Sequence, residues 1–178
     1  MTTVTHVRRR LAHAAAPARL HTLGAGEFEG YASLFGIPDG AGDVVAPGAF
    51  ARSLRTRPPA RVRMLYQHFA HEPIGVWQAI REDGRGLYVR GQLVTDTQRG
   101  AEVAALLRDG ALNGLSIGFR TRRAARDAAT GNRILLEVEL WEISVVTFPL
   151  LPASHVTAIG ANSGLAGEIR RASAALRP

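Results

Sequence analysis

The fold is decided by one long stretch, which reads Ile134-Leu-Leu-Glu-Val-Glu-Leu-Trp-Glu-Ile-Ser-Val-Val-Thr-Phe148. Apolar residues occupy most positions of both alternating rows, and Pro149 ends the run. Successive side chains of a strand point to opposite faces, so a strand over this stretch is close to fully apolar on both faces. We therefore expect a central strand of a sheet at these positions.

Glu142 is the unusual residue of this strand. Simple alternation places it in the same row as Leu136, Leu140 and Val146, which are apolar. A carboxylate in such a row must be ion-paired or hydrogen-bonded, because burying it alone costs several kcal/mol. Two kinds of partner fit: a nearby arginine, or a histidine imidazole that the carboxylate orients in a serine hydrolase.

The strand expected before it contains a serine between glycines, in the stretch Leu112-Asn-Gly-Leu-Ser-Ile-Gly-Phe119. Alternation puts Gly114, Ser116 and Gly118 on one face and the apolar residues between them on the other. The glycines leave room beside the hydroxyl for a close approach of another backbone. Ser116 is therefore either a strand serine flanked by glycines that allow the strand to bend, or a nucleophile.

The same stretch matches the G-x-S-x-G pattern of α/β-hydrolases. That fold needs a helix directly after the serine, and the residues from Ile117 to Arg123 have no helical apolar face. The chain also lacks alternating strand and helix patterns. The pattern alone therefore does not indicate an α/β-hydrolase.

The remaining segments predict further short strands and few helices. Thr97–Asp109 is expected to form a helix that is capped by Thr95 or Asp96, and Pro47–Leu54 to form one or two helical turns. Thr121–Gly131 has the composition of a charged loop. Strands are expected at Phe28–Phe35, Val62–Tyr66, Ile74–Ile80, Leu87–Val94 and Asn113–Arg120. This order predicts an α+β fold that is mainly β with flanking helices, and a small, mostly antiparallel β-barrel.

Length and composition indicate one globular domain. The chain has 178 residues, of which 46% are hydrophobic, and it contains no cysteine, which excludes disulfides and thiol nucleophiles. We expect a basic, flexible N-terminal tail over residues 1–26, a domain over 27–160 and a C-terminal tail over 161–178. No stretch indicates a secretory signal or a membrane span. The net charge is +7, and all 22 basic residues are arginine.

Three histidines deserve comparison as candidate functional groups. His68 directly follows an apolar strand, and His71 lies three residues later. This pair has no third ligand at a recognisable spacing, so a metal site is not expected. His155 follows the proline-rich end of the last long strand and is expected to be a surface residue.

Residues 28–159 resemble the prohead, or capsid maturation, serine proteases of tailed phages. The resemblance is carried by several blocks in the same order along the chain. These blocks are Gly30-Tyr-Ala-Ser-Leu-Phe-Gly36, Gly42-Asp-Val-Val-Ala-Pro-Gly-Ala-Phe50, Met64-Leu-Tyr-Gln-His68, Pro73-Ile-Gly75, Gly86-Leu-Tyr-Val89, Leu112–Phe119 and Glu142-Ile-Ser-Val-Val-Thr-Phe-Pro149.

The resemblance implies a fold like that of the herpesvirus assemblins and a serine endopeptidase activity. It implies Ser116 as nucleophile, His68 as base and Glu142 as the third member of the triad, with no metal or other cofactor. The implied substrates are the scaffold segment of the major capsid protein and the chain's own ends, inside the immature capsid in the host cytoplasm. A homodimer or higher assembly is expected, with no membrane and no specific nucleic-acid partner.

Three alternatives remain open from the sequence. A different serine hydrolase would use His155 as base and Asp127 or Glu142 as acid, following the residue order of α/β-hydrolases. A scaffold or assembly protein would keep the fold without activity. A nucleic-acid binder would use Arg8–Arg10 and Arg120–Arg126, although no aromatic-studded basic face or binding motif accompanies that charge.

Overall fold

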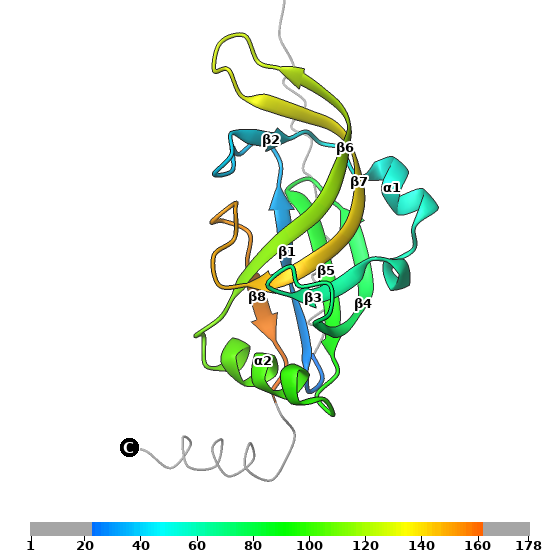
Figure 1. Ribbon diagram of the computed structural model, residues 1–178, viewed down its shortest axis with the longest axis vertical. Coiled ribbons are helices and arrows are strands. Elements are labelled where there is room, and N and C mark those ends of the chain that lie inside the picture. Colours follow the sequence, from blue (N-terminus) through cyan, green and yellow to red (C-terminus); the bar gives the residue numbers. More distant parts are fainter. Residues whose placement is uncertain (1–22, 162–178) are drawn as a thin grey trace, which may run out of the picture.

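In the computed structural model, the structure describes residues 23–161, which form eight strands, two α-helices and one short 3-10 helix, η1 (Figure 1). The two predicted tails, 1–26 and 161–178, lie almost entirely outside these residues. The elements are β1 (Glu27–Leu34), β2 (Asp43–Val45), α1 (Ala51–Thr56), η1 (Pro59–Arg61), β3 (Arg63–Tyr66), β4 (Pro73–Glu82), β5 (Gly86–Leu93), α2 (Gln98–Arg108), β6 (Gly114–Arg126), β7 (Arg133–Val146) and β8 (Val156–Ile159).

All eight strands belong to one curled sheet. Its order is β2-β7-β3-β4-β5-β1-β8, and β6 pairs with the other side of β7. Most pairs are antiparallel, whereas β2 and β3 both run parallel to β7. The prediction of a mainly β, mostly antiparallel fold with flanking helices is confirmed, and the sheet curls into a half-barrel. The expected central strand is β7, which has neighbours on both sides.

The curl brings β1 close to the beginning of β6. The Leu115 N–H donates to the Ser154 carbonyl at 3.0 Å, and the Tyr31 N–H donates to the His155 carbonyl at 3.1 Å. Gly30 permits this approach, since a Cβ at that position would lie 2.3 Å from the His155 carbonyl oxygen. The segment around residue 154 therefore links the two edges of the half-barrel through its backbone.

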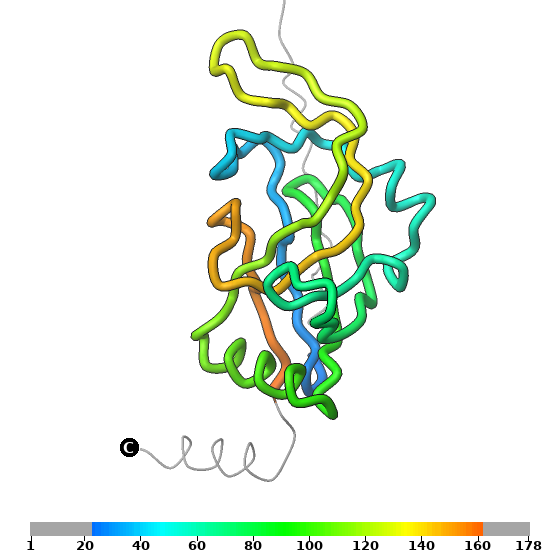
Figure 2. Tube along the Cα trace, viewed as in Figure 1, coloured from blue at the N-terminus to red at the C-terminus, as the bar shows by residue number. Residues whose placement is uncertain are grey.

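The core fills the concave side of the sheet. Fully buried apolar side chains from six strands meet there, and Phe28 packs edge-on against Trp77 with ring centroids 5.5 Å apart. Burying each large side chain of this kind stabilises the fold by about 1.5–3 kcal/mol. The β6–β7 hairpin extends beyond the body at one end, and α2 lies at the other (Figure 2).

The prediction that Thr121–Gly131 forms a charged loop is wrong over the first half of that segment. Strand β6 continues to Arg126, and its register with β7 runs on through Arg123 opposite Glu137 and Ala125 opposite Ile134. The segment has few apolar residues, but a long neighbouring strand supplies backbone partners for it. Pairing in the folded chain thus overrides the local composition.

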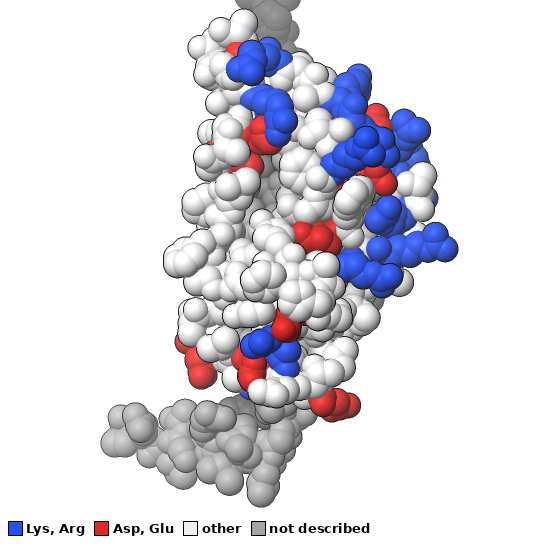
Figure 3. Space-filling view, viewed as in Figure 1, with Lys and Arg blue, Asp and Glu red and all other residues white. Residues whose placement is uncertain are grey.

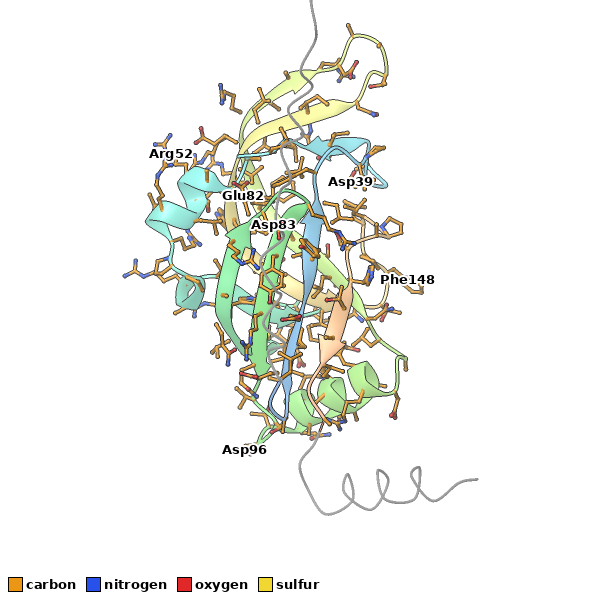
Figure 4. The ribbon with its side chains drawn as sticks, turned by 180° about the vertical axis from the view of Figure 1, so that it is seen from behind. Asp39, Arg52, Glu82, Asp83, Asp96 and Phe148 are labelled. Atoms are coloured by element: carbon orange, nitrogen blue, oxygen red, sulfur yellow. The ribbon has the colours of Figure 1, made fainter. Side chains whose placement is uncertain are left out.

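The helix predictions are correct in place and differ at their ends. The prediction that Thr95 or Asp96 caps α2 is wrong: Thr97 is the cap, and its side chain accepts from the Gly100 N–H at 3.1 Å. Asp96 lies in the preceding turn (Figure 4). The helix expected over Pro47–Leu54 begins only at Ala51, after two turns. The short strands β2 and β8 were not predicted, because three or four residues carry too little periodicity.

Candidate active site

A β-bulge at Trp141 decides which way Glu142 points. Gly118 of β6 pairs with Glu142, and the next residue of β6 pairs with Leu140, so Trp141 is left without a partner. Leu140 and Ile143 are both completely buried in the core, which means that the inward row changes parity at the bulge. The prediction that Glu142 shares a row with Leu140 is therefore wrong. Glu142 and Ser144 lie on the opposite, outer face of β7.

The structure brings His68 and Glu142 into direct contact. Strand β3 pairs in parallel with the end of β7, so the turn after β3 lies beside Ser144 and Glu142. The distance from His68 Nδ1 to Glu142 Oε1 is 2.6 Å. The exposed fraction of the His68 side chain is 44%, against 14% for Glu142. The imidazole thus remains open to a substrate while its carboxylate partner is mostly covered.

Ser144 links these two residues a second time. Its hydroxyl donates to Glu142 Oε2 at 2.7 Å and accepts from the backbone N–H of His68 at 3.1 Å. Ser144 is completely buried. The three residues therefore form a closed set of hydrogen bonds in which both carboxylate oxygens are used, and the imidazole and carboxylate are held in one relative orientation.

The backbone that carries His68 is conformationally unusual. Gln67 and His68 have φ angles of 53° and 61°, in the left-handed region that non-glycine residues seldom adopt. Each such residue costs of order 1–3 kcal/mol and persists only where its surroundings hold it in place. The Gln67 N–H donates to the Val145 carbonyl at 3.0 Å, and its side-chain amide exchanges two hydrogen bonds with Thr147. Contacts with the end of β7 thus maintain the strained turn that positions His68.

The contact with Glu142 also changes the acid–base behaviour of His68. The hydrogen bond to Glu142 raises the pKa of His68 above its usual value, and partial burial opposes that rise. In the neutral imidazole, Nδ1–H donates to the carboxylate and Nε2 keeps its lone pair. The arrangement therefore suits Nε2 to accept a proton, and the carboxylate to stabilise the imidazolium that results.

Ser116 lies on the strand at the other side of β7. It is the direct cross-strand partner of Ser144, and its exposed fraction is 8%. Partners in an antiparallel pair point to the same face, which places Ser116 on the face of Glu142 and Ser144. Among the hydrogen bonds within residues 23–161, none joins Ser116 to His68. The structure thus joins His68 directly to Glu142, and places Ser116 one strand beyond Ser144.

The glycine after Ser116 has a specific role in this arrangement. A Cβ at Gly118 would lie 2.0 Å from Glu142 Oε1, so the carboxylate side chain occupies the space that the glycine leaves open. The sequence suggested that this space would receive another backbone. At Gly114, a Cβ would indeed lie 2.5 Å from the Val146 carbonyl oxygen. Sequence reasoning missed Ser144 and Gln67, whose roles depend on contacts between strands.

The residues of the alternative hydrolase hypothesis are engaged elsewhere. His155 Nδ1 lies 2.8 Å from the Ala153 carbonyl oxygen. Asp127 lies at the tip of the β6–β7 hairpin, where backbone N–H groups of Ala129 and Thr130 lower its pKa. That tip is roughly 35 Å along β6 from Ser116 at the rise of a strand. The acidic partner of the alternative, Glu142, is bound to His68.

His71 does not join His68 at the site, and its ring stacks on Phe69 with centroids 5.6 Å apart. In the part of the chain that the structure describes, no three His, Asp or Glu side chains gather as a metal site would require. No helix between residues 23 and 161 has both the length and the apolar character needed to cross a membrane.

Comparison with known sequences identifies a family. The model of the caudovirus prohead serine protease family matches residues 16–165. The prohead protease of Enterobacteria phage HK97 is 37% identical over 142 residues, which cover 79% of this chain and 63% of that protein. The prohead protease of Escherichia phage T5 is 31% identical over 112 residues, or 62% and 52% of the two chains. The chain thus spans less than two thirds of the length of either relative.

Comparison with solved structures shows that this curled half-barrel fold is shared with viral proteases. The capsid assembly protease of bacteriophage T4 has a TM-score of 0.54 and 16% identity, over 67% of this chain and 80% of that one. A KSHV protease in complex with a hexapeptide phosphonate inhibitor has a TM-score of 0.53 and 11% identity, over 85% and 77%. At these identities the likeness concerns the fold alone, and it agrees with the predicted herpesvirus-protease type of barrel. On the family match and the HK97 relative together, the chain belongs to the caudovirus prohead serine protease family.

Proposed function

We propose that this chain is a serine endopeptidase in which Ser116 is the nucleophile, His68 the general base and Glu142 the residue that orients the base. The observation that carries the proposal is the 2.6 Å contact of His68 Nδ1 with Glu142 Oε1, on the face of the sheet that also carries Ser116. Membership of a serine protease family supports the reaction class.

The proposed reaction proceeds in two steps. His68 Nε2 takes the proton of the Ser116 hydroxyl as Oγ attacks the peptide carbonyl carbon, and Glu142 stabilises the imidazolium that forms. His68 then gives that proton to the leaving nitrogen, the C–N bond breaks and an acyl-enzyme remains. In the second step a water molecule attacks the ester, His68 again moves the proton, and the Ser116 hydroxyl is restored.

The proposed substrate is the scaffold segment of the major capsid protein, together with the chain's own ends, within the immature capsid. The names of the relatives support this setting, because two are prohead proteases and one is a capsid assembly protease. Cleavage inside a closed particle would commit assembly to maturation, since a hydrolysed peptide bond is not remade there.

Co-expression of the full chain with the major capsid protein of the same genome tests the proposal. Intact-mass spectrometry is expected to show a shortened capsid protein and trimmed protease with the wild type, and intact masses for both with Ser116→Ala. His155→Ala is the matched control, and we expect it to cleave as the wild type does. Full-length capsid protein with the wild type would support a non-enzymatic assembly role, and loss of cleavage only in His155→Ala would support the alternative hydrolase.

A further inference from the structure

A cleft of about 990 Å³ lies beside the candidate active site, and we call it the arginine cleft. It is formed by α1, η1, the first residue of β3 and the facing part of the β6–β7 hairpin. Figure 3 shows basic side chains gathered along the side of the molecule that carries α1, and Figure 4 shows Arg52 on the outer side of that helix. The cleft is lined by Arg52, Arg57, Arg61, Arg63, Arg122 and Arg123.

The arginine cleft carries a net positive charge, because arginines outnumber carboxylates in its lining. Two carboxylates, Glu137 and Glu139, lie among the six guanidinium groups, which leaves a net charge of +4. Arg52 pairs with Glu137 at 3.2 Å, and Arg57 pairs with Glu139 at 3.3 Å. Arg122 also pairs with Glu139.

Three arginines of the cleft remain without a carboxylate. Among residues 23–161, Arg61, Arg63 and Arg123 form no ion pair and no side-chain hydrogen bond, and all three are exposed. Cations that line one cleft repel one another, so a bound anion would stabilise this arrangement. The cleft therefore has the electrostatic character of a binding site for a negatively charged group.

The arginine cleft is continuous with the face that carries the candidate triad. Arg63 is the register partner of Glu142 in the parallel pair of β3 and β7, so the two residues lie on adjacent strands. Glu139 precedes Glu142 by three residues on β7, a distance of about 10 Å along a strand. A polypeptide that extends from Ser116 along the hairpin would enter the cleft within a few residues.

We propose that the arginine cleft binds an acidic segment of the polypeptide substrate, about four to eight residues from the scissile bond on one side. This inference rests on the proposed peptidase function and names a feature of its substrate. The lining favours a peptide over a single-stranded nucleic acid. None of the described residues that line the cleft is aromatic, and single-stranded nucleic acids are commonly bound by stacking on aromatic side chains.

A binding measurement tests the cleft separately from catalysis. The full chain carrying Ser116→Ala is titrated, by fluorescence anisotropy, against a short labelled peptide of alternating glutamate and alanine. The matching glutamine–alanine peptide and a single-stranded oligothymidylate of equal length are the comparison probes. We expect the acidic peptide to bind, and binding to weaken about ten-fold when Arg61→Gln, Arg63→Gln and Arg123→Gln are added.

A control for total charge removes three exposed arginines outside the cleft, by Arg85→Gln, Arg108→Gln and Arg126→Gln. We expect the Kd of that variant for the acidic peptide to stay within two-fold of that of the Ser116→Ala parent, because remote surface charges contribute little to the binding free energy. Equal loss in both triple variants, equal binding of the glutamine peptide, or preferential binding of the oligothymidylate would each overturn the inference.

A cleavage measurement links the cleft to substrate choice. The same three arginine substitutions are then made in the chain that keeps Ser116. With the capsid protein as substrate, we expect this variant to have a KM about ten-fold higher than that of the wild type and nearly the same kcat, because the cleft binds ground state and transition state alike. Unchanged KM in an active enzyme would contradict the inference about the substrate. Absence of cleavage by the wild type would contradict the proposed function instead, and the binding measurement would still decide whether the cleft takes acidic peptides.

Discussion

Gly118 and Glu142 are cross-strand partners on β6 and β7, and the Glu142 carboxylate fills the space above the glycine. The position of the carboxylate that contacts His68 thus depends on the absence of a side chain at Gly118, two residues after Ser116. The pairing of β6 with β7 therefore affects Ser116, Glu142 and, through the carboxylate, His68.

Replacement of this glycine tests the relationship. Gly118→Ala puts a methyl group 2.0 Å from the present position of Glu142 Oε1, so the carboxylate must leave the position in which it contacts His68. We expect kcat for capsid-protein cleavage to fall about 100-fold, the loss typical of a misplaced general base. Gly84→Ala is the control, since a Cβ there meets nothing within 4 Å. Full activity in Gly118→Ala would show that the orientation of Glu142 is not needed.

Removal of the Glu142 charge is expected to lower the pKa of His68. In Glu142→Gln the amide no longer stabilises the imidazolium, so the cause of the raised pKa is lost. NMR titration of the His68 ring in both proteins measures the shift directly. Activity should fall about 10³-fold or more, because the tautomer and the imidazolium both lose their partner. An unchanged His68 pKa would contradict this interpretation of the contact.

The raised pKa of His68 also predicts how its contribution to stability depends on pH. The folded protein holds this proton more tightly than the unfolded chain does, so the pair contributes fully below the unfolded pKa of about 6.5. The contribution is lost as pH rises through the higher folded pKa. We therefore expect the difference in unfolding free energy between wild type and His68→Gln to be larger at about pH 6 than at about pH 9. Urea unfolding at both pH values measures it, and a difference that grows with pH would contradict the prediction.

Ser144 is expected to be a positioning residue. Ser144→Ala removes a buried hydroxyl that bonds to Glu142 and to the backbone of His68, and we expect a loss of about 1–3 kcal/mol in unfolding free energy. We also expect kcat to fall while KM stays close to that of the wild type, because Ser144 holds His68 and Glu142 in place.

The variant Ser116→Ala is the matched comparison for Ser144→Ala. Ser116 is the proposed nucleophile, so its replacement should abolish cleavage. Its side chain makes no hydrogen bond within the described residues, so we expect stability to stay within about 0.5 kcal/mol of the wild type. If Ser144→Ala kept both wild-type stability and wild-type kcat, the proposed positioning role would be wrong.

Much of the fold was predictable because its signals are local. The apolar run of β7, the glycine and apolar alternation of β6 and the Thr97–Asp109 helix pattern each depend on neighbours along the chain. The extra length of β6 was not predictable from composition, since its arginines and alanines become strand only by pairing with β7.

A mainly β domain follows from the amino-acid sequence alone, and a family resemblance indicates the three candidate residues Ser116, His68 and Glu142. The folded structure alone shows on which face Glu142 lies, because the bulge at Trp141 exists through the pairing of β7 with β6. It also reveals the hydrogen bonds of Ser144 with His68 and Glu142, of which His68 lies on a turn 76 residues away and Glu142 on the same strand. Alternation is a property of neighbouring residues, whereas register is set by two strands that meet after folding.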